Sequence, residues 1–361
     1  MPPAPLRIGI VGFGFAAQTF HLPLIRAVEG LEIVAVASSD AAKVAAFLPD
    51  ARVHSSPDGL IADQAIDLIV IASPNETHAP VARAALSAGK HVVVDKPFTV
   101  TLDQARELIA LADQRQRVLS VFHNRRFDSD FLSVTRAISD GRIGAPVHFE
   151  SHFDRFRPQV RDRWRERAVA GGGIWFDLGP HLVDQALCLF GLPDAVSGDL
   201  AVQRSSGQID DWAHVLLHLG SVRAVLHASM LVAGGSNRFT VHGGRGSLVK
   251  ARIDQQEAQL LSGVAPGSSG WGVDDDPLVV IDSEGAARSE PAECGDQTRY
   301  YAGVRDAILG RGPNPVAPIE ALAVMAVIEA AAQSSREGRV VALALGDDER
   351  AAYADARRHS T

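Results

Sequence analysis

Short apolar runs alternate with helical periods through the first third of the chain. The apolar runs predict five strands, at Arg7–Val11, Glu32–Ala37, Leu68–Ala72, His91–Val94 and Val118–Phe122. Between them, helices are predicted most clearly over Ala79–Ala88, which Gly89 ends, and over Leu102–Gln114, which Thr101 begins. Strands that alternate with helices are typical of a parallel sheet. We therefore predict an α/β Rossmann-type domain with a doubly wound parallel sheet over residues 1–123.

The pattern changes after residue 123. A helix is predicted at Asp128–Ser139, and Val147–Phe156 then alternates apolar and polar residues as a strand with one buried face does. Further strands are predicted at Asp211–Leu219, Val222–Leu231, Arg238–His242, Ser247–Lys250, Gln259–Leu261 and Leu278–Ile281. Helices are predicted at Ile174–Phe190, Gln297–Leu309 and Ile319–Gly338. Residues 124–361 are thus expected to form a second domain, of the α+β class, that holds the substrate.

Composition and charge exclude several classes of protein. The chain has 361 residues, of which 46% are hydrophobic and 22% charged, which suits two compact domains. No apolar run is long enough to predict a membrane span, and the first residues lack a signal-peptide pattern, so we expect a cytoplasmic protein. A net charge of −8 argues against nucleic acid as a partner. Cys188 and Cys294 are too few for a disulfide framework or a cysteine metal site.

A glycine-rich loop follows the first predicted strand. Gly12-x-Gly14-x-x-Ala17 stands where that strand gives way to a helix. Gly12 permits a tight turn, Gly14 lets the backbone approach a pyrophosphate, and the helix N-terminus faces the anion. The sequence therefore predicts that a dinucleotide binds along the loop residues Gly12, Phe13, Gly14, Phe15 and Ala16.

The end of the second strand bears on which dinucleotide binds. Ser38 and Ser39 stand where an acidic residue would bind the ribose 2′-hydroxyl of NAD, and Lys43 follows one turn later. Hydroxyls and a lysine accept a 2′-phosphate without like-charge repulsion, so NADP is favoured over NAD. Asp40 leaves two alternatives: it caps the helix that begins at Ala41, or it reaches the ribose itself.

Polar residues also follow the next two strands. Ser73, Pro74, Asn75 and His78 come after Leu68–Ala72, and Asp95-Lys96-Pro97 comes after His91–Val94. Ligands of open α/β sheets bind outside the carboxyl ends of the strands, so these residues are expected to border the nicotinamide end of the cofactor. An ordinary turn with a helix cap is the alternative for the first group, and a solvated loop lysine is the alternative for Lys96.

A second group of candidates lies on the predicted helix Ile174–Phe190, which follows three consecutive glycines. Asp177, His181 and Asp184 stand at i, i+4 and i+7 and share one face of this helix. Asp177 and His181 are candidate catalytic residues, against the alternative of a histidine that only fills a structural place. No metal is expected here, because no further ligands occur at a recognisable spacing.

Residues around the strand Val147–Phe156 are candidates for binding the substrate. His152 and Asp154 lie near the end of its polar face, and Arg155 and Trp164 belong to the arginine-rich segment that follows. The alternative is a sheet with a solvated polar face.

Taken together, these motifs resemble those of the Gfo/Idh/MocA oxidoreductases. The matching motifs, in order, are Gly12-x-Gly14-x-x-Ala17, Ser73-Pro74-Asn75-x-x-His78, Asp95-Lys96-Pro97 and Gly171-Gly172-Gly173-Ile174-x-x-Asp177-x-Gly179-x-His181. The phrases Thr19-Phe20-His21, His123-Asn124-Arg125-Arg126 and His152-Phe153-Asp154-Arg155 are similar to a branch that contains NADP-dependent scyllo-inositol dehydrogenases. The resemblance covers nearly the whole chain, with Asp95 in place of the usual glutamate and Ala17 in place of the third glycine.

The resemblance implies a fold and an activity. It implies a Rossmann domain, then an α+β domain whose large, open, mostly antiparallel sheet often mediates a homodimer or homotetramer, and a cis Lys96–Pro97 bond. It also implies hydride transfer between nicotinamide and a secondary alcohol of a cyclic polyol or sugar, with His123 and Asn124 near the substrate. An alcohol oxidation needs a base, for which His181 is the candidate, while Lys96 stabilises the alkoxide; these two roles can be exchanged.

Two functions of other kinds stay open. One is a glycosidase that uses a tightly held NAD to oxidise a sugar transiently and so eliminate its glycosidic bond. The other is a sensor that binds the dinucleotide without turnover. Lys96, Asp177 and His181 together argue against the sensor, because a sensor needs no proton-transfer groups.

Overall fold

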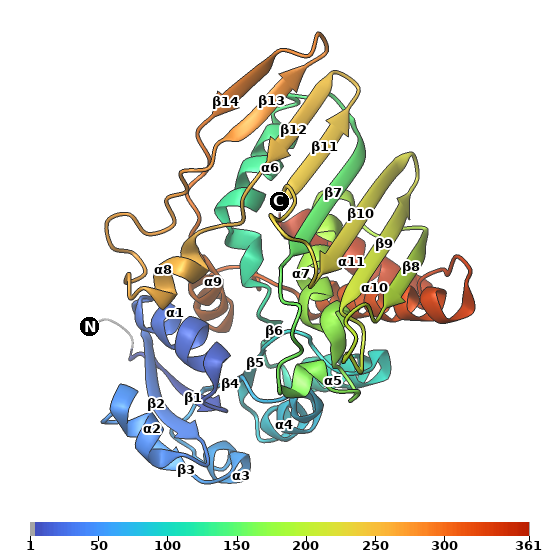
Figure 1. The fold of residues 1–361 in the computed structure, drawn as a ribbon. Coiled ribbons are helices and arrows are strands. Elements are labelled where there is room, and N and C mark those ends of the chain that lie inside the picture. Colours follow the sequence, from blue (N-terminus) through green and yellow to red (C-terminus); the bar gives the residue numbers. More distant parts are fainter. Residues whose placement is uncertain (1–3, 361) are drawn as a thin grey trace.

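The computed structural model describes residues 4–360, and the first of its two sheets is entirely parallel (Figure 1). Its six strands follow the order β3-β2-β1-β4-β5-β6. They are β1 (Leu6–Val11), β2 (Leu31–Ala37), β3 (Arg52–His54), β4 (Leu68–Ile71), β5 (His91–Val94) and β6 (Leu119–Val121). The strand order reverses between β1 and β4, which is the place where such sheets bind ligands. The predicted doubly wound parallel sheet is confirmed.

Helices cover both faces of this sheet, which explains why its central strands are apolar throughout. Every residue of β4 is fully buried, as expected of a parallel strand between two helical layers. The helical elements are η1 (Ala17–His21, a π-helical turn), α1 (Leu22–Arg26), α2 (Ala41–Phe47), α3 (Pro57–Ile61), α4 (Asn75–Ser87) and α5 (Leu102–Arg115). α4 begins four residues before the predicted helix and runs through Pro80, which has no backbone N–H to donate within the helix.

The second sheet has eight strands in the order β14-β13-β12-β11-β7-β10-β9-β8. Only β7 and β10 pair in parallel among these described strands, so the open, mostly antiparallel sheet implied by the resemblance is confirmed. The strands are β7 (Pro146–Asp154), β8 (Ala195–Ala201), β9 (Trp212–Leu219), β10 (Val222–Ser229), β11 (Phe239–Gly243), β12 (Gly246–Lys250), β13 (Leu278–Asp282) and β14 (Ala287–Glu290).

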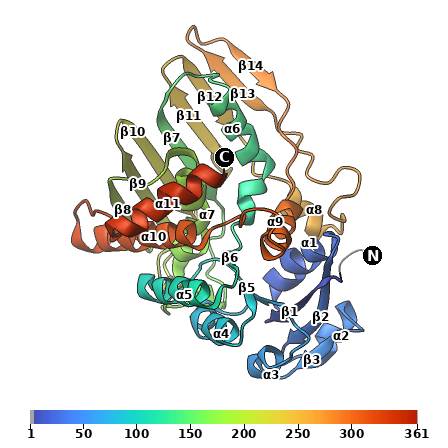
Figure 2. The ribbon, with the colours of Figure 1, turned by 180° about the vertical axis from the view of Figure 1, so that it is seen from behind.

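Helices pack on one face of this sheet, as the two opposite views show (Figures 1 and 2). The helical elements of the second half are η2 (Asn124–Phe127), α6 (Ser129–Ser139), η3 (Trp164–Glu166), α7 (Gly173–Phe190), α8 (Gln256–Leu261), α9 (Thr298–Ile308), α10 (Pro318–Glu337) and α11 (Asp347–Ser360). α10 lies so close to β8 that a Cβ at Gly198 would stand 2.4 Å from the carbonyl oxygen of Ala331. No helix within residues 4–360 is long and apolar enough to cross a membrane.

One predicted strand is wrong. Gln259–Leu261 belongs to the helix α8, which begins where the Asp254 carboxylate accepts a hydrogen bond from the backbone N–H of Gln256 at 2.7 Å. A three-residue apolar run cannot distinguish a strand from one turn of helix.

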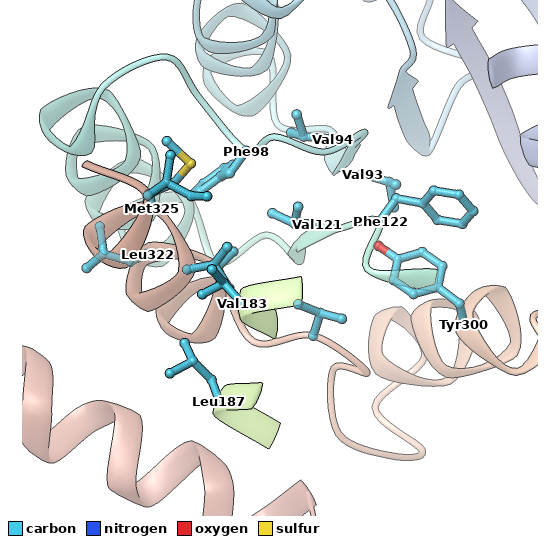
Figure 3. Close-up of a cluster of buried hydrophobic side chains, with 14 of the residues drawn as sticks. Val93, Val94, Phe98, Val121, Phe122, Val183, Leu187, Tyr300, Leu322 and Met325 are labelled. Carbon is cyan, nitrogen blue, oxygen red and sulfur yellow. The ribbon is translucent and has the colours of Figure 1, made fainter. Parts of the chain in front are cut away.

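A hydrophobic core joins the first sheet to the helices α7, α9 and α10 (Figure 3). Val93, Val94 and Val121 from β5 and β6 are buried beside α7 and α10, together with Phe98, Phe122, Val183, Leu187, Tyr300, Leu322 and Met325. Each such buried side chain contributes about 1.5–3 kcal/mol. The loop after β5 is therefore held against α7, while the division of the chain at residues 123 and 124 stays a prediction.

Candidate active site

The glycine-rich loop leaves β1 at the point where the strand order reverses. Gly12 has φ of +88°, and a Cβ there would lie 2.7 Å from the carbonyl oxygen of Ala72, so only glycine fits. A Cβ at Gly14 would meet no atom within 4 Å, which leaves its backbone open to a ligand. Phe13 is buried against Phe47 with ring centroids 5.9 Å apart, whereas Phe15 is exposed. This loop fits the pyrophosphate of a dinucleotide.

At the end of β2, the structure confirms the helix cap at Asp40, while a ribose contact of this residue stays a prediction. Its Oδ1 accepts a hydrogen bond from the backbone N–H of Lys43 at 2.9 Å, so Asp40 caps α2. The backbone N–H of Asp40 donates to Ser38 Oγ at 3.1 Å. Ser39 and the Lys43 side chain are exposed beside this cap.

Asn75 and His78, at the start of α4, tie loops together. Asn75 Nδ2 donates to the carbonyl oxygen of Gly171 at 3.0 Å. The buried His78 ring lies between the carbonyl oxygens of Pro97, at 2.8 Å, and Ser73, at 3.0 Å. Ser73 Oγ is hydrogen-bonded to Thr77 Oγ1 at 2.5 Å, and the intervening Pro74 begins the turn. These residues hold the loops around the crevice, and their contact with a cofactor stays a prediction.

Lys96 reaches from the first sheet to α7. The Lys96–Pro97 bond is cis, as the resemblance implies. Lys96 Nζ donates to the backbone oxygen of Asp177 at 2.7 Å and to its Oδ1 at 3.2 Å, and Arg165 Nε lies 3.5 Å from the same Oδ1. Burial would raise the pKa of Asp177, but the cations Lys96, Arg165 and Arg155 outweigh it and lower the pKa to about 2. Asp177 is therefore a carboxylate that orients Lys96.

Asp95, beside Lys96, is buried in a polar network of its own. His21 Nε2 lies 3.7 Å from the Asp95 carboxylate, and His21 Nδ1 is hydrogen-bonded to the hydroxyl of Tyr301 at 2.6 Å. Burial would raise the pKa of Asp95, but His21, Lys96 and His78 outweigh it and lower the pKa. The backbone N–H of Lys96 donates to Asp95 Oδ1 at 2.8 Å, so this carboxylate helps to fix the loop that carries the lysine.

His181 is buried one turn beyond Asp177. Only 6% of His181 is exposed, and its Nδ1 has no hydrogen-bond partner among the described residues. Burial lowers the pKa of His181 well below its usual range, and the nearby cations Lys96 and Arg125 lower it further. The ring is neutral at pH 7; its Nδ1 is buried, and the rest of the ring lines the cavity described below.

Asp184, the third residue of this helical face, points to different partners. Its carboxylate receives Arg126 Nη2 at 2.7 Å, and Arg126 also pairs with Glu320 at 3.2 Å. His123 is buried nearby, with no hydrogen-bond partner for either ring nitrogen among the described residues. Burial lowers the pKa of His123, so it is neutral. These residues have a structural position and do not line the cavity that Asp177 and His181 line.

A cavity of about 460 Å³ connects the two halves of the site. Eight of the predicted site residues line it: Phe15, Ala16, Asp95, Lys96, Asn124, Arg155, Asp177 and His181. The cavity walls also include residues that the sequence did not single out as site residues, among them Phe20, Phe122, Arg125, Arg204, Asp210 and Glu257. Its volume suits a nicotinamide ring with a small substrate.

One end of the cavity is strongly basic. The segment after β7 contributes Arg155, Arg157, Arg161, Arg163 and Arg165 to its wall. Burial lowers the pKa of Arg155, but only from a very high value, so this guanidinium stays charged. The arginine-rich segment noted in the sequence therefore does face the cavity.

Four predicted substrate residues do not line the cavity: His123, His152, Asp154 and Trp164. Along β7 the side chains alternate, so that Phe153 faces α7, where its ring centroid lies 6.1 Å from His181. His152 and Asp154 consequently point from the opposite face of the sheet and do not line the cavity. Trp164 lies outside the cavity wall as well, beneath the guanidinium of Arg165 at 4.7 Å.

The three glycines before α7 make room for protein groups. Gly173 has φ of +89°, and a Cβ there would come 2.2 Å from Asp210 Oδ1. Asp210 Oδ2 accepts the backbone N–H of Trp175 at 2.9 Å and so caps the helix that carries Asp177 and His181. Burial raises the pKa of Asp210 to about 6. The space that these glycines leave is thus taken by Asp210 at Gly173 and by Asn75 at Gly171.

Two family models and a known bacterial protein match this chain. Residues 6–123 match the model of an oxidoreductase family's NAD-binding Rossmann fold, and residues 135–343 match the C-terminal alpha/beta domain of the same family. The uncharacterised oxidoreductase YdgJ of Escherichia coli is 50% identical over 342 residues, which are 94% of this chain and 99% of that one.

Two further proteins are similar to this chain over nearly its whole length. The scyllo-inositol 2-dehydrogenase (NADP(+)) IolW of Bacillus subtilis is 33% identical over 94% of this chain and 96% of its own. A solved structure from Klebsiella pneumoniae has a TM-score of 0.93 at 57% identity and covers 98% of this chain and 99% of its own.

Proposed function

Because the chain belongs to the Gfo/Idh/MocA family of oxidoreductases, we propose that it transfers hydride reversibly between NADP and a secondary alcohol or ketone of a cyclic polyol or sugar. One observation carries this proposal: Lys96 from the first sheet and Asp177 and His181 from α7 meet in one cavity with the glycine-rich loop. A relative named as a scyllo-inositol dehydrogenase supports a polyol as the substrate.

The side chains have distinct parts in the reaction. Bound NADP supplies the nicotinamide that accepts the hydride. The neutral His181, which lines the cavity, accepts the hydroxyl proton, because an alcohol must lose a proton as hydride leaves its carbon. Lys96 stabilises the negative charge that develops on the oxygen, and the Asp177 carboxylate holds the lysine in place.

The NADP preference rests on the end of β2. Asp40 is engaged in capping α2, which leaves Ser39 and Lys43 exposed to meet a 2′-phosphate. NAD-specific sites of this kind place a free carboxylate there for the ribose 2′-hydroxyl.

A substrate panel tests the proposal. The purified protein is mixed with NADP or NAD and with inositols, aldoses, ketoses and sugar acids, and the reduced nicotinamide is followed by its absorbance. The sugar acids are included because arginines line one end of the cavity. We expect turnover with NADP and at least one polyol or sugar.

Two other results would replace this proposal. Tight dinucleotide binding without turnover on any compound would indicate a sensor. Release of free sugar from a glycoside without net reduction of the cofactor would indicate a glycosidase.

A further inference from the structure

The polar face of the second sheet, which points away from α7, concentrates histidines on four neighbouring strands. Cross-strand register places His227 of β10 opposite His152 of β7 and opposite His214 of β9. Further histidines on this face are His148, His218 and His242. The catalytic cavity does not account for this face, since none of these residues lines it.

Three of these polar side chains converge on one point. His152 and Asp154 of β7 and His227 of β10 each offer one atom, and the three atoms lie within 4.8 Å of one another. His152 Nδ1 is 3.3 Å from Asp154 Oδ2, and His227 Nε2 is 3.6 Å from Asp154 Oδ1. Ligand atoms that surround a tetrahedral Zn²⁺ at about 2.0–2.1 Å lie about 3.3 Å apart. Each histidine nitrogen lies within about 0.3 Å of this spacing from the carboxylate, His152 at Oδ2 and His227 at Oδ1.

The Asp154 carboxylate supplies an independent observation. Only 2% of this side chain is exposed, and its Oδ1 has no hydrogen-bond partner among the described residues. A buried carboxylate oxygen without a donor is costly unless a cation compensates it. His152 and His227, at 19% and 13% exposed, leave a path by which an ion can enter.

The surrounding groups orient both imidazoles. Glu150 Oε2 lies 3.3 Å from His152 Nε2, so that Nε2–H can donate to Glu150 when Nδ1 is a ligand. His214 Nδ1 lies 3.3 Å from His227 Nδ1, so that the other nitrogen of His227 faces Asp154. A carboxylate behind a histidine ligand is the usual support of a metal site.

We propose that His152, Asp154 and His227 bind a divalent first-row transition-metal ion, with Zn²⁺ as the simplest case. Two imidazole nitrogens and one carboxylate suit Zn²⁺ or Co²⁺, whereas Mg²⁺ and Ca²⁺ prefer oxygen ligands alone. Three protein ligands leave the remaining coordination position to water. The site lies on the opposite side of the sheet from His181, so it is separate from the proposed hydride transfer.

Metal titration of the full chain tests this proposal. Protein without a polyhistidine tag is stripped with a chelator and titrated calorimetrically with Zn²⁺, then with Co²⁺ while visible absorption is recorded. We expect one Zn²⁺ per chain, tetrahedral Co²⁺ bands, and no binding of Mg²⁺. His227→Asn and Asp154→Asn are each expected to weaken Zn²⁺ binding at least about 100-fold, and Glu150→Gln by roughly 10–100-fold.

A matched control comes from the same face. His242 stacks on His148 with ring centroids 5.7 Å apart and lies outside the proposed ligand set, so His242→Ala should leave binding unchanged. Circular dichroism shows whether each variant is folded, and zinc should raise the melting temperature of wild type but not of folded His227→Asn.

Two results would overturn the site. One is wild-type protein that binds no zinc, which would leave a hydrogen-bonded histidine network without metal. The other is binding that survives His227→Asn and is lost in His242→Ala, which would indicate adventitious zinc on His148 and His242.

Discussion

Replacing Asp177 by asparagine removes the negative charge that orients Lys96 but keeps the shape of the side chain. The pKa of Asp177 falls from its ordinary 3.8 to about 2, and one pKa unit corresponds to about 1.4 kcal/mol. The ionised carboxylate, whose side chain is 23% exposed, therefore contributes about 2 kcal/mol to the free energy of unfolding at pH 7. Asp177→Asn should lose this amount.

The difference in the free energy of unfolding between wild type and Asp177→Asn should fall at low pH. Because the pKa of Asp177 is lower in the folded state, its contribution is complete above about pH 5 and is lost as the pH falls through 3.8 toward 2. At pH 3 the difference between wild type and Asp177→Asn should shrink to about 1 kcal/mol.

Urea unfolding between pH 7 and pH 3 measures this difference. Tryptophan fluorescence is a suitable signal, because all four tryptophans lie beyond residue 123, in the part of the chain that holds Asp177: Trp164, Trp175, Trp212 and Trp271. Asp199→Asn, at an exposed carboxylate on β8, is the matched control and should change little. Equal stability of wild type and Asp177→Asn at pH 7, or a difference that does not shrink at pH 3, would mean that the ionised Asp177 carboxylate does not stabilise the fold.

Three further predictions follow from the structure. Ser39→Asp places a negative charge where the 2′-phosphate is proposed to bind, so it should shift the ratio of kcat/KM for NADP over NAD toward NAD by roughly tenfold or more. Ser39→Ala should shift this ratio little. An unchanged ratio for Ser39→Asp would count against this placement of the 2′-phosphate. Arg126→Met leaves Asp184 buried without an ion-pair partner and leaves Glu320 with Arg357 alone, at 3.6 Å, and should cost about 3–5 kcal/mol in urea unfolding; a wild-type midpoint would disprove the pairing. Gly173→Ala should lower the melting temperature more than Gly263→Ala, since both glycines have positive φ but only the Cβ at Gly173 meets a neighbour, Asp210. Equal losses would mean that the Asp210 side chain moves away from the new Cβ without cost.

Local sequence signals predicted the parts of the fold that are buried and regular. β4 and β5 are continuous apolar runs between two helical layers, and such runs are visible without any tertiary information. β3 was not predicted, because Arg52 and Val53 are exposed and the strand has three residues. β8 was not predicted either, since Gly198 interrupts it to admit α10.

The site was predicted where a motif marks a strand or helix end, and not where tertiary pairing brings residues together. Lys96 and His181 stand in such motifs, and the cavity joins them. Asp210 reaches α7 from a loop 33 residues beyond Asp177, which no local pattern reveals. The alternation of β7 was predicted correctly, but which of its faces α7 covers depends on packing, and so His152 and Asp154 were assigned to the substrate.

The proposed metal ligands illustrate the same limit. His152-x-Asp154 is visible in the sequence, but its third partner depends on the parallel pairing of β7 with β10, which brings in His227 from 73 residues beyond Asp154.

Single-turnover kinetics of hydride transfer test the proposed roles of Lys96 and His181. Wild type, Lys96→Met and His181→Asn are each mixed with NADP and the best substrate from the panel, and the formation of reduced nicotinamide is followed, with NADP affinity measured separately. Each variant is expected to lose roughly 100-fold or more in rate and to keep its affinity for NADP. Near-wild-type rates in both variants would contradict these roles.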